Sequence, residues 1–188
     1  CAAALEATLD AARALSPGVW IARLDEIAAW WAARATVTCA DVGPRRYAIR
    51  VDGPPGTTVF GRAVEPAADI DPWDGTYHRI HALEFEVSAA SRPFIGLTPR
   101  SAPQLRAFLV EQGYVVETTG EGFVHEFIFD WPEFDAADRR PVLAAIEKSN
   151  FPLVRLGRWP DGNRSALAVT GDIDALTLWD YGLRLFGH

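Results

Sequence analysis

Residues 166–186 read ALAVTGDIDALTLWDYGLRLF. The first five residues are small or apolar, as expected of a buried strand, and apolar residues from Leu176 to Phe186 recur at the spacing of one helix face. A loop with two aspartates joins the predicted strand to the predicted helix. A buried strand, a loop with carboxylates and an amphipathic helix form one β/α unit, the repeating piece of a barrel or a doubly wound sheet.

The two aspartates, Asp172 and Asp174, are separated by one residue. Alternation along an extended segment places both carboxylates on the same side, at a strand end where α/β enzymes keep their chemistry. Paired carboxylates can hold a divalent cation, and one that stays unbound can act as a base toward metal-bound water. In the competing interpretation, either aspartate caps the helix that follows. The pattern alone leaves both interpretations open.

Working toward the N-terminus, residues 131–188 carry two further elements before this β/α unit. A helix is predicted over 138–149, with Pro141 tolerated in its first turn, and a short strand over 153–156. We expect residues 131–188 to form one piece that contains a helix, a turn and the β/α unit.

Residues 35–130 show the short alternating runs and turn residues of antiparallel strands. The same block carries an alternating strand at 82–88 and one amphipathic helix at 104–113. The two hairpins that we predict pair residues 46–51 with 57–60, and 114–118 with 123–129. We expect this block to be a β-rich accessory domain with one helix.

Residues 1–34 are predicted to form a helix over 5–15, a short strand over 19–21 and a second helix over 24–31. These elements are too few to bury their own apolar surface, so they need a partner layer. The whole chain is therefore predicted to be of the α+β class, with a central antiparallel, sandwich-like β-rich domain flanked by helical and β/α pieces.

The composition limits the classes of function. The chain has 188 residues, 49% of them hydrophobic, and a formal net charge of -7. Nucleic acid is an unsuitable partner, because binding to a phosphate backbone depends on clustered Lys and Arg, whereas this chain is acidic and its adjacent arginines form only the isolated doublets Arg45-Arg46 and Arg139-Arg140. No apolar run reaches the roughly 18 residues of a membrane span. We expect a soluble chain, either cytoplasmic or exported, and a portion of a longer or processed protein because residue 1 is Cys1.

The histidines and cysteines do not form a recognisable site. His78 and His81 are three residues apart in a segment with a strand pattern, which favours two independent histidines over a ligand pair. His125 is expected to be a hydrogen-bonded or solvent-edge histidine. Cys39 is expected to be a small buried hydrophobe. No Ser or Cys nucleophile is arranged with a histidine.

Two segments resemble the polysaccharide deacetylase family. Residues 19–31, VWIARLDEIAAWW, resemble the last strand and helix of its barrel-shaped catalytic domain, and residues 158–174, beginning RWPDG, resemble the start of its first strand. The resemblance implies that Asp172 is the catalytic base on a metal-bound water and that Asp174 is a ligand of the metal, usually zinc. The sequence departs from the family at Gly171, where an aromatic residue is usual.

The histidine ligands of that family follow a His-x-x-x-His pattern, which these 188 residues do not contain. The resemblance also places the two segments in reverse order, barrel end first, so the chain either joins two tandem units or belongs to a permuted one. Zinc or another divalent metal is expected in the parent protein. The sequence does not decide whether this chain binds a metal or none.

Our leading hypothesis is that the chain is a portion of a polysaccharide deacetylase-like protein whose parent hydrolyses acetyl groups from glycans, and that the chain alone is nearly inactive. The implied partners are the glycan substrate of the parent and an upstream deacetylase-like domain. One alternative is a non-catalytic β-sandwich module that binds glycan or a partner domain, with Asp172 and Asp174 as helix caps. Another is an enzyme remnant kept for assembly.

Overall fold

The computed structural model describes residues 2–33, 35–120 and 124–169. The chain is of the mixed α+β class, as predicted. The helices of this part of the chain are α1 (Ala2–Arg13), α2 (Leu24–Ala32), α3 (Pro103–Glu111) and α4 (Arg139–Lys148), with a short 3-10 turn, η1 (Pro160–Gly162). The four helices predicted within these residues are all present, and their ends differ from the expected ones by at most three residues. The helix predicted over 176–186 lies outside the described residues.

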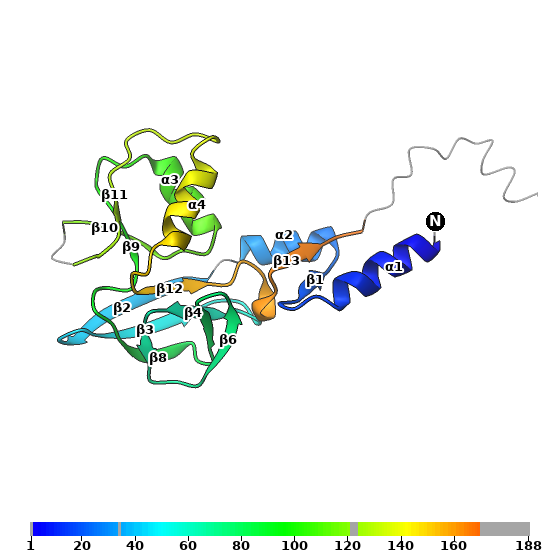
Figure 1. Ribbon diagram of the computed structural model, residues 1–188, viewed down its shortest axis with the longest axis horizontal. Coiled ribbons are helices and arrows are strands. Elements are labelled where there is room, and N and C mark those ends of the chain that lie inside the picture. The colour runs from blue at the N-terminus through cyan, green and yellow to red at the C-terminus, as the bar shows by residue number, and fades with distance from the viewer. Residues whose placement is uncertain (1, 34, 121–123, 170–188) are drawn as a thin grey trace, which may run out of the picture.

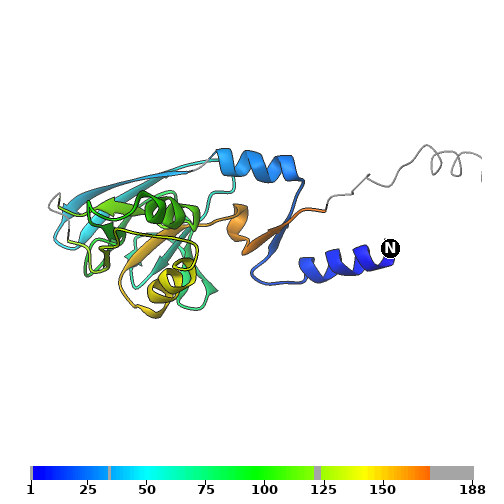
Figure 2. The same cartoon turned by 90° about the horizontal axis from the view of Figure 1, so that it is seen from above.

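The strands are β1 (Val19–Ile21), β2 (Thr36–Gly43), β3 (Arg46–Asp52), β4 (Val59–Arg62), β5 (Glu65–Pro66), β6 (Ile70–Asp74), β7 (Tyr77–Ile80), β8 (Glu84–Ser88), β9 (Ile95–Leu97), β10 (Val116–Thr118), β11 (Ile128–Phe129), β12 (Leu153–Leu156) and β13 (Ser165–Leu167). Figures 1 and 2 show the strands β2 to β12 with α3 and α4 on one side of the molecule, and α1, β1, α2 and β13 on the other.

Two antiparallel sheets make up most of the β-rich part. Their strand orders are β2-β3-β8-β5 and β12-β4-β7-β6. One core cluster draws Ile49 and Phe85 from the first sheet and Val59 and Val154 from the second, so apolar side chains of both sheets share one core. The alternation in β3 and β8, with every second residue buried, follows from one face meeting this core and the other meeting solvent.

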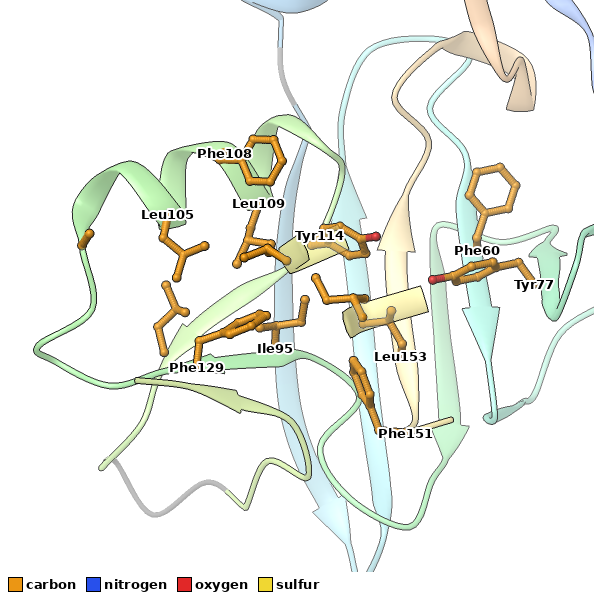
Figure 3. Packing of buried hydrophobic residues seen from close by; sticks show 14 residues of the cluster. Phe60, Tyr77, Ile95, Leu105, Phe108, Leu109, Tyr114, Phe129, Phe151 and Leu153 are labelled. Carbon is orange, nitrogen blue, oxygen red and sulfur yellow. The ribbon is translucent and has the colours of Figure 1, made fainter. Parts of the chain in front are cut away.

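A second core lies where α3 and α4 pack on the sheets. Figure 3 shows Leu105 and Leu109 of α3 pointing toward Ile95 and Phe129. Ile146 of α4 and residues of β12 belong to the same cluster. The packing therefore joins α4 and β12 to the block 35–130. The division of the chain into three domains, with boundaries at residues 34 and 130, stays a prediction.

Both predicted hairpins are wrong. Residues 46–51 lie in β3 and residues 59–60 lie in β4, and these two strands belong to different sheets. All four residues of β4 are buried because β4 is an inner strand between β12 and β7, and its neighbours come from distant parts of the chain. The segments 116–118 and 128–129 both pair in parallel with β9, one on each side of it, so they do not pair with each other. Local turn residues could not reveal the strand that lies between them.

Across the part of the chain that the structure describes, the sheets stay open and none closes into a barrel. Within the same residues, no helix combines the length and the apolar character that a membrane span requires.

Candidate functional site

The strands from the two ends of the described chain lie next to each other. β1 and β13 form a two-stranded parallel sheet, in which Trp20 is the register partner of Ala166. Two hydrogen bonds extend the ladder at its ends: the amide of Ala22 donates to the carbonyl of Leu167 at 3.1 Å, and the amide of Arg164 donates to the carbonyl of Gly18 at 2.8 Å. Because the strands are parallel, their carboxyl ends lie at the same edge.

The predicted site residues Asp172 and Asp174 lie outside the described residues. They follow Leu167, the last residue of β13, by five and seven positions in the sequence. The assignment of Asp172 as base and Asp174 as metal ligand therefore stays a prediction. The buried strand predicted over 166–170 is β13, which ends at Leu167 and whose residues are exposed or half-buried, so the prediction of a buried strand that reaches residue 170 is wrong.

Charged residues follow the carboxyl end of β1. The guanidinium of Arg23 donates to both carboxylate oxygens of Asp25, at 2.9 and 2.6 Å, and the amide of Arg23 donates to Glu26. The hydrogen bond from Arg23 lowers the pKa of Asp25 below its usual range. Glu26 closes the first turn of α2 as in a capping box. Water screens this exposed group strongly, and its role in the described structure is to start α2.

Four tryptophans hold this end of the molecule together. Trp159 contacts Trp20 and Trp31, with ring centroids 6.2 and 5.3 Å apart, and Trp20 meets Trp30 edge-on at 6.2 Å. The indole nitrogen of Trp30 donates to the backbone carbonyl of Arg158 at 2.9 Å. The two segments on which the family resemblance rests are thus in direct contact, although more than a hundred residues separate them.

A pocket of about 330 Å³ lies beside the tryptophan cluster. Trp30 and Trp31 line it together with the start of β2, the turn around Pro54, the end of α3 and the segment 156–158. Trp31 is half-buried at the pocket wall. The pocket could not be predicted from the sequence, because its lining residues are widely spaced along the chain.

A second polar group is centred on Glu147 of α4. The hydroxyls of Tyr114 and Tyr77 both donate to Oε1 of Glu147, at 2.6 and 3.0 Å. Nη1 of Arg62 lies 3.6 Å from Oε2, and Nη1 of Arg155 lies 3.6 Å from Oε1. Burial raises the pKa of Tyr77 to about 12 and that of Tyr114 further still, so both phenols stay protonated donors. This group joins β4, β7, β12 and α4.

A third polar group surrounds Arg92, of which 3% of the side chain is exposed. Its guanidinium donates to both oxygens of Glu117, at 2.5 and 2.7 Å, and to Asp41 at 2.6 Å. His125 is fully buried and hydrogen-bonds Glu117 at 2.8 Å, which confirms the prediction of a hydrogen-bonded histidine. Burial acts to raise the pKa of Glu117, but the bonds from His125 and Arg92 outweigh it and lower that pKa.

His78, His81 and Cys39 do not form a metal site. His78 lies exposed in β7, while His81 lies just after that strand and contacts Asp71 at 2.6 Å, so the two histidines act independently, as predicted. Cys39 is half-buried against the core, and burial raises its pKa to about 11. Among residues 2–33, 35–120 and 124–169, no three His, Cys, Asp or Glu side chains gather into a group able to hold a metal ion.

Comparison with models of known protein families, with curated proteins and with solved structures found no match for this chain.

Proposed function

We propose that this chain is a portion of a polysaccharide deacetylase-like protein whose parent hydrolyses acetyl groups from glycans. The observation that carries the proposal is the parallel pairing of β1 with β13. In a closed barrel of parallel strands, the last strand lies beside the first and runs in the same direction, because closure leaves no free edge. β1 resembles the last strand of the deacetylase barrel, and β13 resembles the first.

The same pairing favours one catalytic unit over two. Tandem units would place the closing strand of one barrel and the opening strand of the next in separate sheets. Here the two strands share hydrogen bonds, so we infer that both belong to a single barrel with a permuted strand order. The β-rich part between them, including α3 and α4, is then an accessory domain inserted between the closing and the opening strand.

The chemistry follows from the position of the aspartates in the sequence. Active sites of parallel barrels lie at the carboxyl ends of the strands, and Asp172 and Asp174 follow the carboxyl end of β13. The net reaction adds water to the acetyl carbon and releases acetate and the free amine or hydroxyl of the glycan. In the parent, a zinc or other divalent ion would supply a water molecule of lowered pKa.

The described residues contribute no metal site of their own, and the 188 residues lack a His-x-x-x-His pattern. We therefore assign no reaction step to the described side chains, and we expect the isolated chain to be nearly inactive. Asp172 and Asp174 require partner ligands from elsewhere in the parent.

Acetate release from acetylated chitooligosaccharides by the full-length parent tests the proposal. Asp172→Asn is expected to lower the rate by about 100-fold or more, the usual contribution of a general base. Asp161→Asn is the matched control, because Asp161 is exposed, has a φ of 57° that Asn also tolerates, and lies before β13. Wild-type rates in Asp172→Asn, or rapid acetate release by the isolated chain, would contradict the proposal.

A further inference from the structure

The pocket beside the tryptophan cluster is built mostly from the β-rich part of the chain. Its walls come from α2, the first residues of β2, the end of α3, residues 113–116 and residues 156–158. Its volume of about 330 Å³ is at the lower end of the range for small-molecule sites, about 300–1,000 Å³. It is therefore large enough to take a small ring rather than a long chain.

The chemistry of the lining selects the class of ligand. Trp30 and Trp31 supply aromatic surface, and Glu111 and Arg158 supply one negative and one positive group. An anion would be repelled by the carboxylate and a cation by the guanidinium, so this pair of charges does not favour a ligand with a single net charge. A sugar ring combines an apolar face, which suits an indole, with hydroxyls that can bond to both charged groups.

The walls are held in place by hydrogen bonds and ring contacts, some of which join two lining residues. The indole of Trp30 is fixed by its hydrogen bond to the carbonyl of Arg158, and Trp31 rests edge-on against Trp159 at an interplanar angle of 89°. The segment 156–158 is fixed by backbone hydrogen bonds from Leu156 to Gly113, at 2.8 Å, and from Gly157 to Thr58, at 2.9 Å. A preformed pocket binds its ligand with a smaller loss of conformational entropy.

We propose that this pocket binds one sugar ring of a glycan, with Trp31 as an aromatic wall and Glu111 and Arg158 as hydrogen-bonding groups. The site is separate from the carboxyl ends of β1 and β13, and binding there requires neither a metal nor Asp172. It therefore goes beyond the proposed hydrolysis, and it would position a glycan chain relative to the paired strands.

Titration of the 188-residue chain with chitotetraose, followed by calorimetry, tests the proposal. We expect a dissociation constant of about 1 mM or lower and a loss of about tenfold in affinity for Trp31→Ala, the scale of one aromatic contact. Glu111→Ala, an exposed position that leaves the core unchanged, is expected to weaken binding severalfold. Glu133→Ala, at another exposed glutamate outside the pocket, serves as the matched control and keeps wild-type affinity.

The outcomes separate this proposal from the deacetylase proposal. An affinity that falls about tenfold in Trp31→Ala and severalfold in Glu111→Ala supports the pocket even if the parent releases no acetate. Absence of binding at about 10 mM chitotetraose, or binding that both variants leave unchanged, overturns it. The Glu111→Ala result keeps the test decisive if Trp31→Ala fails to fold.

Discussion

Glu147 is the counter-ion of a buried arginine, and replacing it by glutamine should destabilise the chain strongly. Arg62 is 1% exposed, and within the described residues its Nε and Nη1 have no hydrogen-bond partner, so the nearby carboxylate balances its charge. Removing one partner of a fully buried pair costs about 3–5 kcal/mol. The side chain of Glu147 is 43% exposed, and water therefore screens part of the charge that is lost. We expect Glu147→Gln to lower the free energy of unfolding by about 2 kcal/mol.

Glu147→Ala should cost more, because it also removes the acceptor of two buried hydroxyls. The hydrogen bonds from Tyr77 and Tyr114 contribute about 1 kcal/mol each, which brings the total to about 4 kcal/mol. Urea unfolding followed by circular dichroism measures both values. Glu133→Gln, at an exposed glutamate on the loop before α4, is the control and should stay within about 0.5 kcal/mol of the wild type.

A double-mutant cycle tests whether the unpaired charge of Arg62 causes the loss of stability in Glu147→Gln. Arg62→Met keeps most of the volume between the rings of Tyr77 and Phe151, which lie 5.1 Å from the guanidinium carbon. If the cost of Glu147→Gln comes from the unpaired charge of Arg62, that cost should fall below about 1 kcal/mol in the Arg62→Met background. An equal cost in both backgrounds, or a cost under about 0.5 kcal/mol for Glu147→Gln alone, would refute the reasoning.

Three further perturbations follow from the same structure. Gly157→Ala should destabilise the chain by about 1–3 kcal/mol in urea unfolding, because the new Cβ would lie 2.2 Å from Oγ1 of Thr58, and Thr58→Ala should recover part of the loss. Because the pKa of Glu117 is lowered in the folded chain, its ionised form stabilises the fold above the usual glutamate pKa of about 4.3, and stability should fall as the pH drops below that value. Glu117→Gln should flatten this dependence of stability on pH, as measured by thermal unfolding. Trp159→Ala should loosen the β1–β13 pair, with the amide of Ala22 exchanging hydrogen at least about tenfold faster while amides of β3 stay protected.

Elements with a repeating local pattern were predictable from the sequence. The period of Leu105, Phe108 and Leu109 indicates the buried face of α3, and all three are buried. Alternation in residues 84–88 likewise indicates β8, with Phe85 and Val87 on the core side. These patterns are visible because a helix or strand with one solvated face repeats its apolar residues at a fixed interval.

Pairing between strands was not predictable in the same way. β9 lies between β10 and β11, and the partners of β4 are β7 and β12, so turn residues next to β4 carried no information about its neighbours. The parallel contact of β1 with β13 joins segments far apart in the chain. The family resemblance located both segments without showing that they pair.

The partners of the buried polar side chains could hardly be predicted from the sequence. Arg62 directly follows the apolar run of β4, and a charged residue at the end of a buried strand could have suggested a buried partner. The residues near Arg62 in the sequence do not indicate Glu147 as its partner, because only the tertiary packing of α4 brings Glu147 close to Arg62. The sequence pattern that predicted Asp172 and Asp174 depends on the strand they follow, and the structure defines that strand over Ser165–Leu167.

Removal of the metal from the full-length parent tests the central claim most directly. The measurement is the rate of acetate release from acetylated chitooligosaccharides before and after treatment with a chelator, and again after zinc is added back. We predict a loss of at least about 100-fold on chelation and recovery with zinc, since a Lewis-acid metal contributes several kcal/mol to such a reaction. An unchanged rate without metal, or no acetate release by the untreated parent, would contradict the claim.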